Sequence, residues 1–563
     1  MTSAKRASTV CLLATLSVLG LTLLPIASVA APQDTTRAVA PSARLGIILV
    51  IDQMVPDYLA RFSGQFTGGL ARLLRDGLLF SNAYHDHAAT ETSVGHATLS
   101  TGRYPMHNGV IGNDWYDRED RRVVYSCEDS ASHILGDTAA VGRSPRRLIG
   151  LALGDWMKKL RPTTRVYSVA LKDRASILLG GQHPDAAFWY SRSTGRFVSS
   201  EYYMASVPAW LDSFNSSGAV TLNYRKGWTL LLPDSAYHLS HADKFPSEND
   251  GVHTTFPHLF DTATGVPDKN YFGAFYGTPF ADGLLLDLAR TVIAHAELGL
   301  DTVPDLLCIS CSAADAIGHT YGPNSWEIQD YYLRLDKYLD TFLTYLDQTV
   351  GANKYCIAMS SDHGILPLPE DLQNQGIASK RLPIDSITRD IRAIGVQIQA
   401  DFKLEGNPVA DASYDVHLSY DGARKKGMSD PDLQQIVAAR IRHLPYIADA
   451  FTRDELQSGG GAGRLYFEQF RNSFHPLRGP DIYLRYPEYA LPGSSKFGTS
   501  HGTPYSYDTN VPILFLCHTT SGRNTDHIMT IDLAPTLARL LGVQIGLRDM
   551  DGRALQQLFP AGR

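Results

Sequence analysis

The apolar run Leu45–Ile51, with the sequence LGIILVI, ends abruptly at Asp52. An unbroken apolar run of this length is typical of a strand that is buried on both faces of a parallel sheet. Ligands of such sheets bind beyond the carboxyl ends of the strands. The run therefore predicts a buried strand, with Asp52 at the edge of the sheet where chemistry takes place.

The same pattern of an apolar segment followed by charged side chains recurs along the chain. Helical patterns separate the segments, and this alternation predicts an α/β fold with a mostly parallel central sheet that is flanked by helices. One edge of the sheet would carry the function. The further segments are Arg165–Ala170 before Lys172, Asp173 and Arg174, Asp305–Ser310 before Asp315, Tyr355–Met359 before Asp362 and His363, and the late strand Val511–Cys517.

The helical patterns have recognisable ends and apolar stripes. Gly69–Asp76 predicts a short amphipathic helix, and Ile531–Leu541 predicts a closing helix. Trp326–Val350 predicts a long helix, with Asn324 and Glu327 placed as a capping box. Its core-facing stripe is expected to consist of the residues at helical spacing, which are Ile328, Tyr332, Leu335, Leu339, Phe342 and Leu346.

Two regions interrupt the alternation of strands and helices. Phe188–Phe280 is rich in Tyr, Trp, Ser, Asn and Pro, and Pro383–Pro492 contains charged helical stretches and a glycine-rich loop. We expect a single domain over residues 44–563, with cap insertions over the carboxyl edge at roughly 188–280 and 383–492. Two peripheral domains without contact to the active site are the alternative.

The N-terminus has the pattern of a secretory signal peptide. Lys5 and Arg6 precede the apolar run Val10–Leu24, and small residues at Ser28–Ala30 suit a cleavage site. We therefore expect a signal peptide over residues 1–30, a flexible lead-in over residues 31–43 and a secreted protein in the periplasm. An uncleaved membrane anchor is the alternative, although the run is short for a spanning helix of about 20 residues.

Composition limits the classes of partner and of metal site. The net charge of −7 provides no basic surface for nucleic acid. After signal cleavage we expect a monomer without membrane attachment. The chain has one CxxC pattern, at Cys308–Cys311, and no second one that would complete a zinc site of the cysteine type. A metal would therefore be held by oxygen and imidazole ligands. Buried free thiols are expected at Cys127, Cys308, Cys311, Cys356 and Cys517.

The polar side chains at the predicted edge suit divalent metal ions. Carboxylates and imidazoles without cysteine favour zinc-like ions, and the set is large enough for two of them. Two ions about 4 Å apart can hold the attacking and leaving oxygens of a phosphoryl displacement. Each residue alone is weak evidence, and only the set is informative: Asp52, Asp315, His319, Asp362, His363 and His501.

The stretch His87–Asp117 contains the candidate nucleophile. Thr92 lies at the expected start of a helix, where the helix dipole favours a phosphate. Thr90 and Ser93 compete with it for the role of the nucleophile. A free hydroxyl is a poor nucleophile and needs activation, which a metal could supply.

The order and spacing of these residues resemble the alkaline phosphatase superfamily. Within it they look most like the periplasmic, phosphate-irrepressible alkaline phosphatases with a threonine nucleophile, a likeness that Asn113, Lys172 and Arg174 support. The resemblance implies a phosphorylated Thr92 and two zinc ions. One zinc would be held by Asp52, Asp362, His363 and the Thr92 oxygen, and the other by Asp315, His319 and His501.

The expected reaction is the hydrolysis of small phosphate monoesters. A monoester has nearly two negative charges, which Arg174 can grip bidentately while Lys172 adds a point charge, with Asn113 as a further contact. We therefore expect a zinc-dependent phosphomonoesterase, and the sequence leaves open whether calcium adds stability. Glu91 departs from this picture, since it adds a negative charge beside Thr92.

Three other functions fit the same pattern less well. A nucleotide pyrophosphatase or phosphodiesterase shares the threonine and the six ligands but usually lacks the Lys and Arg pair. An inactive secreted metal-binding protein would be expected to have lost a ligand, and none is lost. A sulfatase needs Cys or Ser at the position of Thr92.

Overall fold

The structure is a computed structural model that describes residues 43–559 except 119, 138–139, 261, 263–264, 414, 518–519 and 547–548. The predicted signal peptide and residues 31–42 of the lead-in lie outside the described residues. Within the described residues, no helix is both long enough and apolar enough to cross a lipid bilayer.

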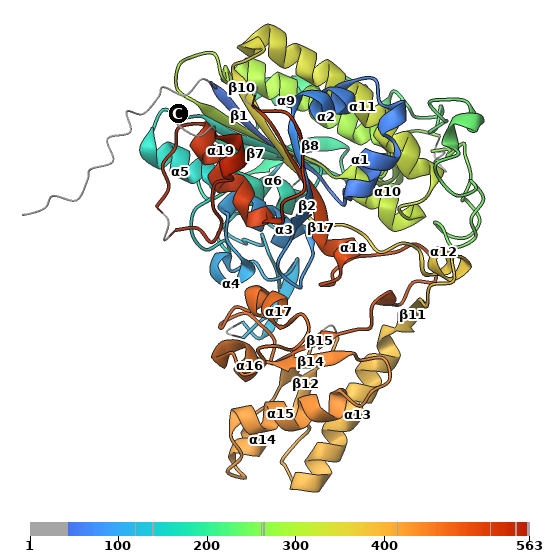
Figure 1. Ribbon diagram of the computed structural model, residues 1–563, viewed down its shortest axis with the longest axis vertical. Helices are drawn as coiled ribbons and strands as arrows, with labels where there is room; N and C mark the ends of the chain where they lie inside the picture. Colours follow the sequence, from blue (N-terminus) through green and yellow to red (C-terminus); the bar gives the residue numbers. More distant parts are fainter. Residues whose placement is uncertain are drawn as a thin grey trace, which may run out of the picture. The chain divides into compact units, whose positions relative to one another are not determined.

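A mixed sheet forms the centre of the fold, with helices on both faces (Figure 1). The described residues form an 11-stranded sheet in the order β18-β2-β17-β10-β1-β9-β6-β7-β8-β5, with β19 beside β2. The strands of this sheet are β1 Leu45–Ile51, β2 Leu78–Tyr84, β5 Ile134–Leu135, β6 Val166–Ala170, β7 Ala186–Ser191, β8 Arg196–Ser200, β9 Asp305–Cys311, β10 Tyr355–Ser360, β17 Asn510–Leu516, β18 Gly522–Asn524 and β19 Ile528–Met529.

The strands that carry the predicted site residues are parallel neighbours. β1 pairs in parallel with β10 and β9, and β9 pairs in parallel with β6. Leu45 lies opposite both Tyr355 and Asp305, so the strands start in line and end at a common edge. β17 is antiparallel to β10 and β2. The prediction of a mostly parallel sheet is confirmed.

Strand β1 shows why its sequence is apolar throughout. Ile47 and Leu49 belong to the core on one face of the sheet, whereas Ile48 and Val50 belong to the core on the other face. Successive side chains of a strand point to opposite faces, so a strand covered on both sides has no polar positions.

Two groups of helices cover the two faces (Figure 1). Leu59, Leu70, Leu285 and Leu335 from the first group contribute to one core, and Leu99, Met157, Leu179 and Leu537 from the second contribute to the other. The first group is α1 Pro56–Arg61, α2 Gly69–Asp76, α9 Pro279–Ala296 and α11 Trp326–Leu346. The second is α3 Thr92–Thr101, α5 Leu153–Leu160, α6 Asp173–Gly180 and α19 Leu533–Leu540.

The start of α11 corrects the predicted capping box. The N-cap is Ser325, whose side chain accepts a hydrogen bond from the Ile328 amide. Asn324 instead bonds Arg61, and Glu327 bonds His258. Asn324 therefore lies one residue before the N-cap. The predicted apolar stripe of this helix is buried.

The first predicted insertion starts later than expected. Residues 186–200 form β7 and β8 of the central sheet, so the excursion begins after Ser200. The prediction is wrong at this end because the aromatic side chains of β7 pack in the cores beside the sheet and do not belong to a cap. After this point come α7 Ala209–Asn215, the short turns η2 Ala219–Thr221 and η3 Asp234–Tyr237, and α8 Lys269–Tyr276.

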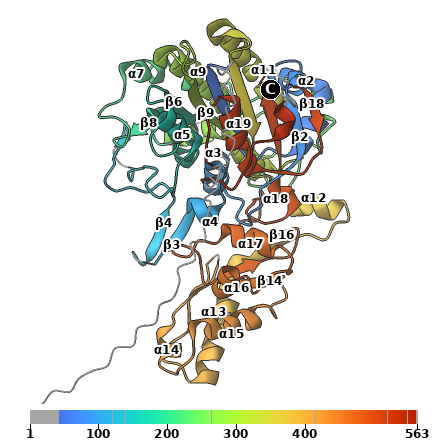
Figure 2. The same cartoon turned by 60° about the vertical axis from the view of Figure 1, so that its left-hand side comes forward.

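The helices and strands of the second predicted insertion lie together (Figure 2). They share an apolar core of their own, which includes Ile391, Val416, Leu433 and Ile482. The parallel pair β11 and β16 joins the two ends of this region. Its elements are β11 Lys380–Pro383, α13 Ile384–Phe402, β12 Val409–Asp411, β13 His417–Leu418, α14 Asp421–Arg424, α15 Asp430–Ile441, β14 Asp449–Thr452, α16 Arg453–Ser458, α17 Phe467–Ser473, β15 Ile482–Arg485 and β16 Ala490–Gly493.

The predicted state of the cysteines is confirmed. Cys127, Cys308, Cys311, Cys356 and Cys517 are all buried and free. Burial raises the pKa of the Cys308 and Cys311 thiols, which makes them unreactive.

Candidate active site

The carboxyl edge of the sheet gathers the predicted metal ligands. Asp52 directly follows β1, Asp362 follows β10, and Asp315 lies in the first turn of α10 Ala313–Tyr321, which follows β9. All three carboxylates are buried. They meet because their strands are parallel neighbours that end at the same edge.

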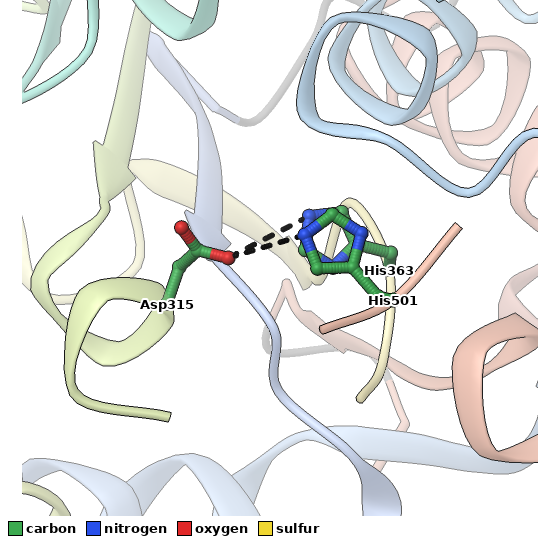
Figure 3. Close-up of side chains that lie close together, drawn as sticks. All are labelled: Asp315, His363 and His501. Atoms are coloured by element: carbon green, nitrogen blue, oxygen red, sulfur yellow. Dashed lines mark ion pairs between the residues drawn. The ribbon is translucent and has the colours of Figure 1, made fainter. Parts of the chain in front are cut away.

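Asp315 is surrounded by three imidazole rings. Its Oδ1 lies 3.3 Å from His319 Nε2, 3.6 Å from His501 Nε2 and 3.9 Å from His363 Nε2. The carboxylate points toward the rings of His363 and His501, which stack with their centroids 3.5 Å apart (Figure 3). The sequence separates these residues widely, and the fold brings them to one point.

The three histidines share one tautomer. Their Nδ1 atoms donate to backbone carbonyls, from His319 to Thr499 at 2.8 Å, from His363 to Gly364 at 2.9 Å and from His501 to Thr90 at 2.6 Å. A carbonyl can only accept, so Nδ1 carries a proton in each ring, and Nε2 is the nitrogen that is left to bind a metal ion. This arrangement is common for histidines that bind metals.

The protonation of two of these rings supports a metal site. Burial lowers the pKa of His363 to about 3, which keeps the ring neutral, and its Nε2 has no hydrogen-bond partner among the described residues. Burial opposes a charge on His501, but Asp315 outweighs it and raises the pKa of that ring. A metal ion and a proton would therefore compete for the His501 nitrogen.

The residues present fit divalent ions. Two groups have ligand atoms close enough to share an ion, namely Asp315 with His363 and His501, and Asp52 with His96 and Asp362. His363 Nε2 also lies 3.3 Å from Asp362 Oδ2, so His363 stands between the two groups. The six predicted ligands thus come together, while their partition between two ions stays a prediction.

His96 is held differently from the three candidate ligands. Its Nδ1 lies 2.8 Å from the Thr92 carbonyl and its Nε2 lies 2.9 Å from Ser310 Oγ. Both nitrogens are therefore engaged. Burial disfavours the charged ring, but Asp52 and Asp362 outweigh it and raise the pKa of His96 to about 9. These contacts favour a structural role, which supports the arrangement of α3.

Thr92 is the first residue of α3 and is buried. Its Oγ1 accepts from Lys172 Nζ at 3.1 Å and from Arg174 Nη2 at 3.4 Å. Thr90 is bonded away from these cations, to the Thr503 carbonyl. Of the candidate hydroxyls, Thr92 is the one that the structure places against the two cations.

Lys172 lies among the carboxylates. Its Nζ is 2.7 Å from Asp315 Oδ2 and 2.9 Å from Asp52 Oδ2. Burial opposes the charge on Lys172, but Asp315 and Asp52 outweigh it and raise the pKa of the ammonium. Lys172 therefore offsets part of the negative charge of the three buried carboxylates, and the charged His96 ring offsets a further part.

The structure gives Glu91 a partner. Its Oε2 accepts from the Asn113 backbone N–H at 2.6 Å, and the side-chain Oδ1 of Asn113 accepts from the Ser93 backbone N–H at 3.0 Å. Burial raises the pKa of Glu91. Glu91 and Asn113 therefore brace the start of α3, and the Asn113 Nδ2 amide is its remaining donor group.

Sequence reasoning missed residues that hold the site in place. Gln53 donates from Nε2 to Asp315 Oδ1 at 2.9 Å and from its backbone N–H to Asp362 Oδ1 at 3.1 Å. Its φ of 63° is unusual for a residue other than glycine. The signal was a polar residue directly after Asp52. Arg143 pairs with Asp173 at 2.6 Å, beside Arg174, and has no such local signal.

Comparisons with known proteins agree with this geometry. The family model for type I phosphodiesterases and nucleotide pyrophosphatases matches residues 46–442. Alkaline phosphatase PafA of Elizabethkingia meningoseptica is 31% identical over 518 residues, which are 90% of this chain and 93% of that protein. Alkaline phosphatase PhoV of Synechococcus elongatus is 32% identical over 525 residues, which are 91% of this chain and 92% of that protein.

Solved structures show the same fold. The crystal structure of wild-type alkaline phosphatase PafA superimposes with a TM-score of 0.83 at 29% identity, and the match covers 92% of this chain and 99% of that one. A second structure of that enzyme, also with a TM-score of 0.83, carries substitutions of a threonine, an asparagine, a lysine and an arginine. This chain belongs to the type I phosphodiesterase and nucleotide pyrophosphatase family of the alkaline phosphatase superfamily, and it is a phosphatase.

Proposed function

We propose that this phosphatase is a secreted, zinc-dependent phosphomonoesterase that works through a phosphothreonine on Thr92. The observation that carries the proposal is the position of the Thr92 hydroxyl against Lys172 Nζ and Arg174 Nη2 at the start of α3. The four residue types substituted in the variant of alkaline phosphatase PafA are those of Thr92, Asn113, Lys172 and Arg174. Secretion rests on the N-terminal sequence.

The proposed reaction has two displacements at phosphorus. In the first, Thr92 Oγ forms a bond to phosphorus, the bond to the alcohol oxygen breaks, and the alcohol leaves with a proton. In the second, water attacks the phosphothreonine, inorganic phosphate leaves and the Thr92 hydroxyl is restored. Lys172 and Arg174 hold the non-bridging oxygens throughout, and the N–H groups at the start of α3 add positive potential.

Bound zinc ions would lower the pKa of the attacking hydroxyl and offset the charge on the leaving oxygen. The residues that would hold them are Asp52, Asp315, His319, Asp362, His363 and His501. The Nδ1 bonds of the three histidines keep their Nε2 lone pairs available.

A phosphodiesterase or nucleotide pyrophosphatase is the second candidate, because the matched family model carries that description. The charge at the site argues against it. A diester has one negative charge fewer than a monoester, so Lys172 and Arg174 would bind it less strongly.

The test compares an aryl phosphate with the matching aryl methyl phosphate diester on purified, zinc-loaded protein. We expect the monoester to have the higher kcat/KM, and we expect Thr92→Ala to abolish turnover while the metal content stays near that of the wild type. Thr92→Ser is the matched control, because it keeps a hydroxyl.

Arg174→Ala sharpens the same test. We expect it to lower kcat/KM for the monoester by about 10- to 150-fold, the equivalent of a charged hydrogen bond, and to lower it less for the diester. A preference of the wild type for the diester, or full activity of Thr92→Ala, would overturn the proposal.

A further inference from the structure

A large cavity adjoins the proposed phosphate site. It has a volume of about 1060 Å³, and its lining includes Lys172, Arg174, Asp315 and His319. A smaller cavity of about 410 Å³ shares Lys172 and Arg174 with it. Cavities of several hundred Å³ hold ligands much larger than a phosphate group. The site therefore has room for a sizeable alcohol part of a substrate.

Arg192 lies where the two cavities meet. It lines both of them, and so does Tyr276. The guanidinium carbon of Arg192 is 3.6 Å from the centroid of the Tyr276 ring. Arg192 follows β7, whereas Tyr276 ends α8, so the fold brings together two residues from separate elements. Stacking on the ring holds the planar guanidinium in one orientation.

The charge of Arg192 is not balanced in the way that neighbouring charges are. Arg143 pairs with Asp173 at 2.6 Å, and Lys172 pairs with Asp52 and Asp315. In the part of the chain that the structure describes, no ion pair joins Arg192 to an acidic side chain. An oriented arginine without a carboxylate partner at the mouth of a cavity can bind an anionic group bidentately.

The remaining walls of the larger cavity suit a planar group. Phe256, Tyr276 and Tyr321 line it, and Phe256 packs on Trp228 with the ring centroids 5.2 Å apart. Aromatic side chains favour stacked or edge-on contact with another ring.

We propose that the larger cavity holds the alcohol part of the substrate and that Arg192 binds a second anionic group on it. The preferred substrates would then be phosphate monoesters of aromatic alcohols that also carry a carboxylate or a further phosphate. This inference rests on the proposed phosphomonoesterase function. Arg192 acts here as a residue that determines specificity, apart from the groups that act on the reacting phosphate.

The test uses phenyl phosphates that differ only in the para substituent. The substrates are 4-carboxyphenyl phosphate, its uncharged counterpart 4-carbamoylphenyl phosphate, and phenyl phosphate. The ratio of kcat/KM for the carboxy substrate to kcat/KM for the carbamoyl substrate measures the effect of the second negative charge on turnover. Comparing this ratio between variants cancels the intrinsic reactivity of each ester.

We expect Arg192→Gln to lower this ratio by about 2- to 5-fold, the range for a solvent-accessible charge pair. Arg192→Lys should keep part of the preference, because it retains the charge but loses the planar contact with Tyr276. Arg389→Gln is the matched control, since Arg389 is an exposed arginine of α13, and it should leave the ratio unchanged. Added salt should weaken the preference of the wild type and have little effect on Arg192→Gln.

The outcomes separate the inference from the function on which it rests. An unchanged ratio in Arg192→Gln would overturn the role of Arg192 and leave the phosphomonoesterase intact. Failure of the wild type to release phosphate from any of the three esters would overturn the proposed function and the inference together.

Discussion

Glu91 connects the start of α3 with the segment that carries Asn113. Its carboxylate accepts from the Asn113 backbone N–H, and Asn113 in turn accepts from the Ser93 N–H next to Thr92. The Glu91 carboxyl group beside Thr92 therefore serves as a hydrogen-bond acceptor. Burial raises the pKa of Glu91, so a neutral side chain with the same acceptor is a fair substitute. We interpret Glu91 as a positioning residue.

Replacing Glu91 tests this interpretation. Glu91→Ala leaves the half-buried Asn113 N–H without its acceptor and should lower kcat/KM for an aryl phosphate by about tenfold. Glu91→Gln keeps an acceptor oxygen and should stay within about threefold of the wild type, on the same reasoning. Steady-state kinetics of both variants provides the measurement. An equal loss in both would mean that the charge of Glu91, rather than its hydrogen bond, matters.

Helix α3 lies very close to the loop that carries the candidate metal ligands Asp362 and His363. A Cβ on Gly95 would lie 2.0 Å from the Asp362 carbonyl oxygen, which is a backbone atom that cannot turn aside. Only glycine permits this contact, and Thr92 lies at the start of the same helix. The packing of one helix thus brings the proposed nucleophile to the carboxyl edge of the sheet.

Gly95→Ala should therefore separate α3 from this loop. We expect a loss of about 1–3 kcal/mol in the free energy of unfolding, as for other overpacked sites, and a drop of more than about tenfold in kcat/KM. Thermal unfolding and kinetics provide the measurements. Gly64→Ala is the matched control, because a Cβ at Gly64 meets nothing within 4 Å. Activity of Gly95→Ala at the level of the wild type would contradict this view of α3.

At the scale of the whole molecule, two buried carboxyl groups lie where the region after Ser200 meets α11. Glu248 and Glu327 are both fully buried. Glu327 Oε1 lies 2.8 Å from His258 Nε2. Glu248 Oε1 lies 3.4 Å from His241 Nε2, and neither Glu248 oxygen has a hydrogen-bond partner among the described residues. Burial and the charge of Glu327 raise the pKa of Glu248, so the folded protein holds a proton there.

This proton links stability to pH. The folded-state pKa of Glu248 lies above the unfolded value, so its contribution to stability is fully present at low pH and is lost as the pH rises. Glu248→Gln needs no proton and should raise the melting temperature more at pH 9 than at pH 5. Differential scanning calorimetry of the metal-loaded protein checks this expectation. Glu468→Gln, at an exposed glutamate of α17, is the control, and an equal shift at both pH values would contradict the prediction.

Much of the fold follows from local patterns in the sequence. The buried strands and the helix at residues 69–76 were predictable because side-chain periodicity reports directly on burial. Ser325 was missed as the cap of α11 because several polar residues precede that helix and tertiary contacts select among them. β7 and β8 were missed because β7 joins the sheet by pairing with β6, and β8 joins it by pairing with β7, and the segment itself does not encode the pairing with β6.

The sequence by itself determined which residues make up the candidate site. The order of Asp52, Thr92, Asp315, Asp362 and His501 follows from strand ends and from the family resemblance. Tertiary structure alone decided how they meet: His363 stands between the two ligand groups, Gln53 and Glu91 brace the site, and Arg192 stacks on Tyr276. The physical reason is that periodicity records the burial of each residue, whereas distances between remote residues depend on strand register and on packing across the sheet.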